Sequence, residues 1–192
     1  MKVIAFNGSP KKEGNTFYLI NKVLETLQHE GVETQIVHIG GKNIRGCQAC
    51  YQCKKNKDSE CAMKDDIIND CIKMMSEADG IIIGSPTYFA DLTSDTKAFI
   101  DRTGFVARAN GNLFKRKLGA AVVSQRRAGA IHTFDSINHL FTISEMIVVG
   151  SNYWNLGFGA GPGDVVNDNE GMENMKNLGE NMAWLLKKTK TV

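Results

Sequence analysis

The chain has 192 residues, of which 42% are hydrophobic and 23% charged, and its formal net charge is +2. This length and composition favour one packed domain over a disordered chain, and the small net charge argues against a dedicated nucleic-acid binder. The sequence begins directly with strand-like residues, and no apolar run is long enough to cross a bilayer, so we expect a cytoplasmic protein with no nucleic-acid or membrane partner.

The first third of the chain predicts strand, helix, strand and then an irregular segment. The apolar run Val3 to Phe6 predicts a strand, and the helical spacing of apolar residues from Tyr18 to Leu27 predicts the helix that follows it. Residues 33–39 are rich in β-branched side chains and end at two glycines, which predicts a second strand. Residues 41–64 show little periodicity and contain most of the cysteines.

The rest of the chain alternates helices and strands. Asp65 and Asp66 open a predicted helix, and the run 78–84, apolar except for Asp79, is typical of a parallel strand buried on both faces. Further elements are expected at 92–105 (helix), 118–123 (strand), 131–143 (helix), 146–149 (strand) and 170–188 (helix). Five successive βα units predict an α/β fold with a five-stranded parallel sheet and helices on both faces. We expect one domain over residues 1–192, with a cysteine-rich insertion at about 41–64.

A polar, glycine-bearing loop follows the first predicted strand. Gly8 and Gly14 permit close backbone approach, Ser9, Asn15 and Thr16 offer polar groups, and the next helix aims unpaired N–H groups at the same place. The spacing matches neither a P-loop nor a dinucleotide fingerprint, which favours a monophosphate as the ligand. The alternative is a polar connection without a ligand.

Two more loops follow strands that end at the same predicted sheet edge, where open parallel sheets bind ligands. The loop after the third strand carries Pro86, Thr87, Tyr88 and Phe89, which offer a rigid turn and flat apolar surface for an aromatic ring system. Residues 124–129 form a cationic turn suited to negative charge on such a ring. Alternatively, the aromatic side chains cap the core and the cationic turn is only solvated.

In order and spacing, these loops resemble those of the NADPH-dependent FMN reductase family, over nearly the whole chain. The resemblance implies a flavodoxin-like three-layer sandwich that binds FMN, with the redox chemistry carried by FMN and no catalytic side chain. It also implies three groups of FMN-binding residues: Ser9, Lys11, Gly14, Asn15 and Thr16 around the phosphate, Pro86, Thr87, Tyr88 and Phe89 along the ring, and Ser124 and Gly129 near its pyrimidine side.

The cysteines follow the pattern C-x2-C-x2-C-x7-C, formed by Cys47, Cys50, Cys53 and Cys61. Compact spacing of this kind holds iron-sulfur cubanes, and four thiolates also suit zinc, so spacing alone leaves both open. The position and spacing resemble those of the iron-sulfur flavoproteins, a branch of the same superfamily, which implies that the four cysteines ligate a 4Fe-4S cluster. Cys71 lies on the apolar stripe of a predicted helix, so we interpret it as a buried core thiol.

The predicted function is an FMN-dependent oxidoreductase that passes electrons between a 4Fe-4S cluster and FMN. One alternative is a cluster-free NAD(P)H-dependent FMN or quinone reductase whose cysteines are free or form a disulfide. The other is a non-catalytic FMN-binding redox carrier or sensor. The resemblance implies a homodimer or homotetramer with clusters near subunit interfaces, and NAD(P)H or ferredoxin as donor. The lysine-rich residues 54–57 either steer an acidic ferredoxin or form a solvated loop.

Overall fold

The computed structural model describes residues 1–189, and the last three residues of the predicted domain lie outside this range. Its sheet has the strand order β2-β1-β3-β4-β5, and every pair of neighbouring strands is parallel. A further short strand, β6, pairs in parallel with the end of β4. The strands are β1 (Lys2–Asn7), β2 (Glu33–His38), β3 (Gly80–Pro86), β4 (Leu118–Gln125), β5 (Ile147–Val148) and β6 (Leu156–Phe158).

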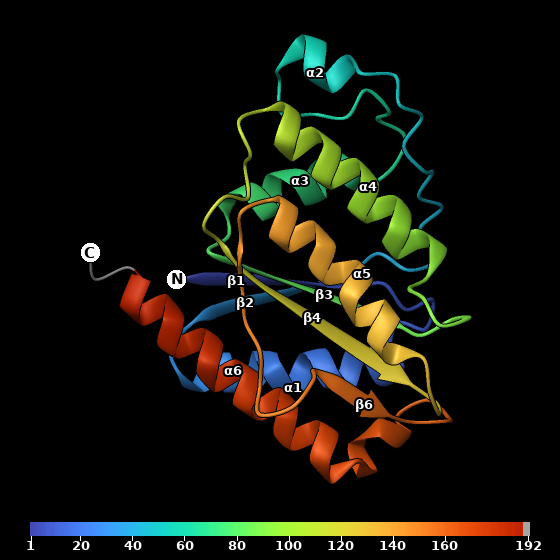
Figure 1. Cartoon of the computed structure of the whole chain (residues 1–192), viewed down its shortest axis with the longest axis vertical. Coiled ribbons are helices and arrows are strands. Elements are labelled where there is room, and N and C mark those ends of the chain that lie inside the picture. Colours follow the sequence, from blue (N-terminus) through green and yellow to red (C-terminus); the bar gives the residue numbers. More distant parts are fainter. Residues whose placement is uncertain (190–192) are drawn as a thin grey trace.

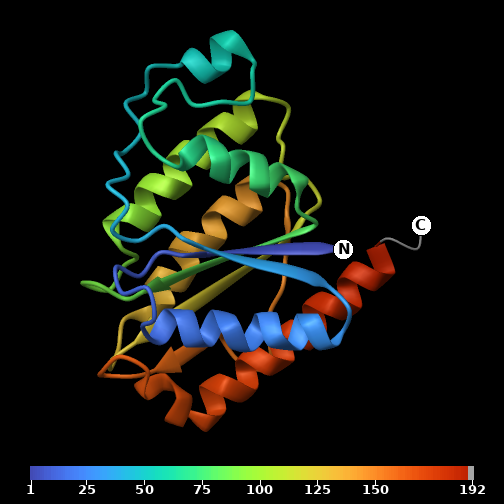
Figure 2. The same cartoon turned by 180° about the vertical axis from the view of Figure 1, so that it is seen from behind.

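Helices cover both faces of the sheet, as Figures 1 and 2 show from opposite sides. Ile4 and Phe6 of β1 pack in the core shared with α3, α4 and α5, whereas Val3 and Ala5 pack in the core shared with α1 and α6. Successive strand side chains point to opposite faces, so a continuously apolar strand fills both cores. The helices are α1 (Asn15–His29), α2 (Gln52–Asn56), α3 (Ile68–Glu77), α4 (Ser94–Ala109), α5 (Ala130–Ile143) and α6 (Asn169–Thr189), with a 3-10 turn η1 (Asp164–Asn167).

The edge of the sheet beside β4 differs from the predicted single strand at 146–149. β5 pairs with the start of β4 and β6 with its end, so the fifth position of the sheet consists of two short segments. Between them the side chain of Asn155 donates to the carbonyl oxygen of Ala121 at 3.0 Å, replacing part of the strand ladder. A side-chain bond of this kind leaves no periodic apolar pattern, which is why the sequence did not predict β6.

The cysteine-rich segment joins β2 to α3, and its short helix α2 lies near the C-terminal end of α4 (Figure 1). It contains one short helix, α2, that the sequence analysis did not predict. Tyr51 and Lys57, at the two ends of α2, both have left-handed backbone conformations. With one turn of helix between two such residues, no helical periodicity can develop in the sequence.

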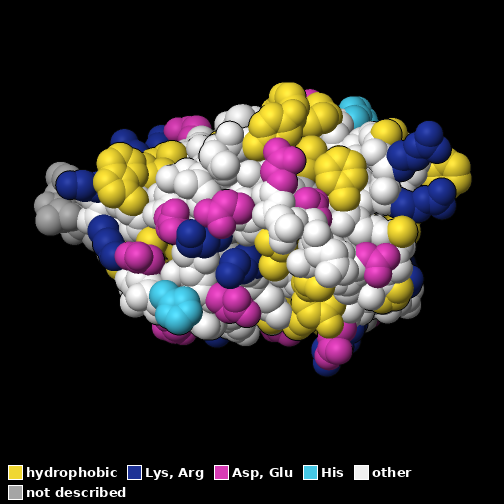
Figure 3. Space-filling model, turned by 90° about the horizontal axis from the view of Figure 1, so that it is seen from below, with side chains coloured by type: hydrophobic (Ala, Val, Ile, Leu, Met, Phe, Trp, Pro, Cys, Tyr) yellow, Lys and Arg dark blue, Asp and Glu magenta, His cyan; other side chains and the backbone are white. Residues whose placement is uncertain are grey.

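The face formed by the lower elements of Figure 1 is shown in Figure 3, where Lys, Arg, Asp and Glu side chains of both signs are interspersed with exposed hydrophobic groups. Tyr153 and Trp154 form an exposed edge-to-face pair with ring centroids 4.7 Å apart. No helix within residues 1–189 combines the length and apolarity needed to span a membrane.

Gly8 follows β1 directly and packs closely against the start of α4, and this contact yields a stability prediction. A Cβ atom at Gly8 would lie 1.9 Å from Oγ1 of the fully buried Thr96. That hydroxyl is paired at 2.8 Å with Oγ1 of Thr93, the residue that caps α4. We expect Gly8→Ala to lower the free energy of unfolding by about 2 kcal/mol, as overpacking does, measured by urea denaturation.

The matched control is Gly150→Ala, because a Cβ there meets nothing within 4 Å. Equal stability of the two variants would contradict the close packing of Gly8 on α4.

Candidate functional site

The carboxyl ends of β1, β3, β4 and β6 meet around one cavity of about 140 Å³. This is the place where ligands bind in open parallel sheets. Nine of the eleven predicted FMN-binding residues line it: Ser9, Lys11, Gly14, Asn15, Thr16, Pro86, Thr87, Tyr88 and Ser124. The structure therefore brings all three predicted loops together in one site.

The first loop is shaped largely by bonds within itself. The side chain of Asn7 accepts from the backbone N–H of Ser9 at 3.0 Å and donates to the carbonyl oxygen of Lys12 at 3.1 Å. The N–H of Lys11 donates to the Ser9 hydroxyl at 3.2 Å. Gly14 precedes the first residue of α1, and no side chain caps this helix. Within the first turn the Phe17 N–H donates to the carbonyl oxygen of Gly14 at 2.9 Å, so the N–H groups of Asn15 and Thr16 are the ones available to an anion in the cavity.

Direct hydrogen bonds link the third loop to both the first and the second. The hydroxyls of Thr16 and Ser124 are paired at 2.8 Å although 108 residues separate them. The backbone N–H of Thr87 donates to the carbonyl oxygen of Ser124 at 2.9 Å. This bond commits the Thr87 N–H to the neighbouring strand, so it is not available to a ligand. The relative positions of the three loops are therefore fixed without any ligand.

A fourth loop, residues 159–162, completes the cavity and was not predicted as part of the site. The side-chain amide of Asn15 donates to the carbonyl oxygens of Gly159 at 3.0 Å and Gly161 at 2.9 Å, and its oxygen accepts from the N–H of Val165 at 3.2 Å. Asn15 thus holds this loop in place, and residues 159–162 of the loop line the cavity. Gln125 and Arg126 also line the cavity. The glycine-rich sequence of residues 157–163 was the available signal for this loop.

Phe89 and Gly129 lie outside the cavity. Tyr88 and Asp91 exchange backbone hydrogen bonds of 2.8 and 3.0 Å, which closes a tight turn and leaves the Phe89 side chain fully exposed. Gly129 has φ +92° and packs against Ala90 of that turn. The predicted contact of both residues with a ligand stays a prediction.

The chemistry of the cavity fits a phosphate-bearing ligand. Lys11 and Arg126 supply positive charge, Ser9 and the start of α1 supply hydrogen-bond donors, and no Asp or Glu of the described chain lines the cavity. Anions bind well where a helix N-terminus and a cation meet. A volume of about 140 Å³ suits the phosphate end of a nucleotide rather than the whole molecule.

The four clustered cysteines line a second, smaller cavity beside α4. Cys47 and Cys50 are exposed, whereas Cys53 and Cys61 are buried. Burial raises the pKa of the Cys53 thiol. A hydrogen bond from the Lys54 N–H lowers this pKa in part, and the proximity of the other three cysteines raises it. All four sulfurs therefore belong to one site.

Within residues 1–189, no three His, Cys, Asp or Glu side chains converge closely enough to hold a single metal ion. A zinc ion needs its thiolates at about 2.3 Å from one point. In a cubane, each thiolate binds a different corner iron, so the four sulfurs surround a space. Four cysteines around one cavity thus provide the donors that a cubane requires.

The profile of the NADPH-dependent FMN reductase family matches residues 1–161. The chain belongs to this family. An iron-sulfur flavoprotein of Methanocaldococcus jannaschii is 38% identical to this FMN reductase family member, over 97% of the chain and 98% of the relative. The iron-sulfur flavoprotein branch predicted from the cysteine pattern is therefore confirmed.

Solved structures show the fold of this family member. RosB, in a structure with the bound intermediate 8-demethyl-8-formylriboflavin-5′-phosphate, matches with a TM-score of 0.81 at 18% identity, over 100% of the chain and 81% of RosB. A flavodoxin from the domain Archaea matches with a TM-score of 0.63 at 19% identity, over 97% and 99% of the two chains. The flavodoxin-like α/β architecture is confirmed, with the sixth strand segment as an addition.

The fifth cysteine of this family member, Cys71, is fully buried in α3, as predicted for a core thiol. Burial raises the pKa of its thiol to about 12. Because the thiolate is the reactive form, we expect Cys71 to resist iodoacetamide at pH 8.5 in the native protein and to react after unfolding in guanidinium chloride. Peptide mass mapping of the two samples measures this, and rapid native labelling of Cys71 would contradict its burial.

Proposed function

We propose that this chain is a flavin-dependent oxidoreductase in which the strand-end cavity holds the phosphate of FMN and the four clustered cysteines hold a 4Fe-4S cluster. When bound, these groups supply two-electron and one-electron redox chemistry, respectively. The observation that carries the proposal is the convergence of three separated loops on one cavity that is rich in donors and cations.

The phosphate role falls to Ser9, Lys11 and the first turn of α1, whose donors and charge face the cavity. The isoalloxazine ring would extend past Thr87 over Tyr88, which is 49% exposed and so offers an open aromatic face. Arg126 lies on the same wall and would stabilise negative charge on the ring. The flavin phosphate bound by RosB, which shares the fold, supports this assignment.

The cysteine role is supported by two independent facts. Cys47, Cys50, Cys53 and Cys61 line one cavity, and a relative 38% identical over almost the full chain is named an iron-sulfur flavoprotein. The cysteine cavity and the FMN cavity share no lining residue. Electrons would therefore pass between the two sites either through the protein interior of one chain or from one chain to another. The expected homodimer or homotetramer stays a prediction, which light scattering can check.

One anaerobic preparation tests the proposed function. We expect released FMN, a flavin spectrum with a broad shoulder near 400 nm, and about four irons per chain, as thiolate-ligated cubanes give. A protein that fails to take up FMN during reconstitution would overturn the proposal. FMN without iron would favour the cluster-free reductase. Steady-state oxidation of NAD(P)H with a flavin or quinone would support an enzyme, and reduction only by a partner protein would support the carrier.

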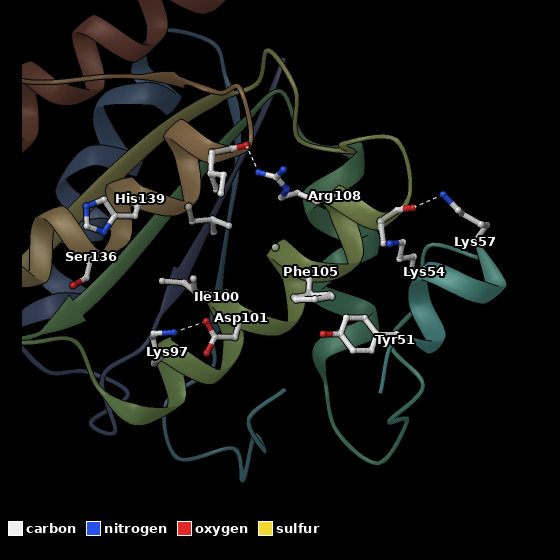
Figure 4. Close-up of a pocket in the computed structure, with 14 residues that line it drawn as sticks. Tyr51, Lys54, Lys57, Lys97, Ile100, Asp101, Phe105, Arg108, Ser136 and His139 are labelled. Carbon is white, nitrogen blue, oxygen red and sulfur yellow. Dashed lines mark hydrogen bonds and ion pairs between the residues drawn. The ribbon is translucent and has the colours of Figure 1, made fainter. Parts of the chain in front are cut away.

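A larger groove of about 710 Å³ adjoins the cysteine cavity and is the proposed docking site for the electron donor (Figure 4). Tyr51 and Phe105 line both spaces and form an edge-to-face pair with centroids 5.8 Å apart. The cations around the groove are Lys54, Lys57, Lys97 and Arg108, against the single carboxylate of Asp101, which already pairs with Lys97. The excess positive charge fits an acidic redox protein of the ferredoxin type better than a second cationic copy.

We expect Lys54→Glu to slow reduction of the protein by a reduced acidic ferredoxin about threefold or more at low ionic strength, because charge complementarity accelerates encounter. Stopped-flow absorbance measures the rate, and added salt should reduce the difference. The control is Lys188→Glu on α6, which makes the same change in net charge on the opposite helix layer. Equal rates for both variants, or a changed oligomeric state in Lys54→Glu alone, would contradict this docking site.

A further inference from the structure

One guanidinium is buried beside the clustered cysteines. Arg102, on α4, has a side chain with 0% exposure, and its ion-pair partner Asp66 has 4%. Removing a full charge from water is costly unless hydrogen bonds and an opposite charge compensate for it. The partners that compensate for Arg102 therefore indicate what its charge acts on.

All five N–H donors of the guanidinium have acceptors. Nε and Nη2 both donate to the sulfur of Cys61, each at 3.4 Å. Nη2 also donates to the carbonyl oxygen of Met63 at 3.1 Å, and Nη1 donates to the carbonyl oxygen of Arg45 at 3.3 Å and to the Asp66 carboxylate. Two of the five donors thus point at one cysteine sulfur, 41 residues away along the chain.

Hydrogen bonds and positive charge at a ligand sulfur stabilise the more negatively charged, reduced form of an iron-sulfur cluster. We propose that Arg102 is a positioning residue that holds Cys61 and raises the reduction potential of the cluster, while Asp66 limits this effect by neutralising part of the charge. This inference rests on the proposed function, because it requires the cysteines to hold the cluster. It explains why an arginine is buried at this point of α4.

A purely structural role is the competing explanation. By bonding the Arg45 and Met63 carbonyls, Arg102 also ties the cysteine segment to α4. Loss of these bonds alone would lower stability or cluster content, yet it would not shift the potential of clusters that remain. The reduction potential therefore separates the two roles.

The experiment is an anaerobic redox titration with dithionite and mediators, in which the one-electron-reduced cluster is followed by electron paramagnetic resonance. Asp66→Asn retains the arginine and removes the neutralising charge, so its potential should rise above that of the wild type. The double variant Arg102→Met with Asp66→Asn leaves no unpaired charge and no donor to Cys61, so its potential should fall below that of the wild type. We expect each shift to be of the order of a tenfold change in the reduction equilibrium, about 59 mV for one electron.

The control is Arg116→Met, which removes an exposed arginine that lines neither the cysteine cavity nor the donor groove and should leave the potential unchanged. If the double variant binds no iron, the reduction potential of the Arg102→Lys variant is measured instead. An iron-loaded lysine variant with a lowered potential would support the proposal, because lysine cannot reproduce both donors to the sulfur. A lysine variant with the wild-type potential, or without iron, would overturn it.

Unshifted potentials in iron-loaded Asp66→Asn and double variants would overturn this inference alone. A wild-type protein that contains FMN and no iron would instead overturn the cluster assignment, and the inference with it. Iron and sulfide analysis of the wild type before the titration distinguishes the two failures.

Discussion

Cys61→Ala is expected to bring the iron content from about four per chain to near zero while leaving bound FMN unchanged. Cys61 is the proposed ligand most remote in sequence from the other three, and its buried sulfur accepts two hydrogen bonds from Arg102. Without it, one corner of a cubane lacks a thiolate and the guanidinium loses its acceptor. Iron analysis, the absorbance near 400 nm and the FMN released by heating measure the three quantities.

The matched control is Cys71→Ala, because Cys71 is also buried and does not line the cysteine cavity. It should lose some stability from the lost burial and keep its iron. FMN should be retained in both variants, since the strand-end cavity shares no lining residue with the cysteine cavity. Full iron content in Cys61→Ala would refute the four-cysteine site.

Lys11→Glu is expected to weaken FMN binding at least about tenfold, because it replaces a cation beside the proposed phosphate site by an anion. The side chain of Lys11 is exposed, so the change should not disturb the core. Fluorescence titration of the FMN-free protein measures the dissociation constant, and the difference should shrink as ionic strength rises.

The neighbouring residue provides the control. Lys12 is also exposed, lies in the same loop and does not line the cavity. Lys12→Glu makes the same change in net charge, so it should weaken FMN binding much less than Lys11→Glu does. Equal losses in both variants would show that only the overall charge of the loop matters, and would argue against a phosphate held beside Lys11.

The sequence predicted the central strands and the main helices because their signals are local. The runs Val3 to Phe6 and Gly80 to Gly84 carry no charged side chain, and a strand buried between two helix layers requires that composition whatever surrounds it. The ends of these elements differ from the prediction where pairing with a neighbouring strand sets them. β3, for example, continues to Pro86 because that residue pairs with Ser124 of β4.

The first loop of the strand-end cavity, residues 8–16, was predictable for the same reason. Its shape comes from bonds among Asn7, Ser9, Lys11 and Lys12, which lie within five residues of one another. The four clustered cysteines were likewise visible as a spacing. In both cases the residues involved lie close together in the chain, so the pattern can be recognised in a short stretch of sequence.

The sequence by itself therefore determined the fold class, the place of the first polar loop at the sheet edge and the set of clustered cysteines. Only the tertiary structure decided that the loop 159–162 closes the strand-end cavity through Asn15, 144 residues from Gly159, and that Arg102 meets Cys61. It also placed Phe89 in solvent, because a backbone turn between Tyr88 and Asp91 directs it away from the cavity. Contacts of this kind depend on how distant segments pack, and a hydrogen bond between such segments leaves no periodicity in either of them.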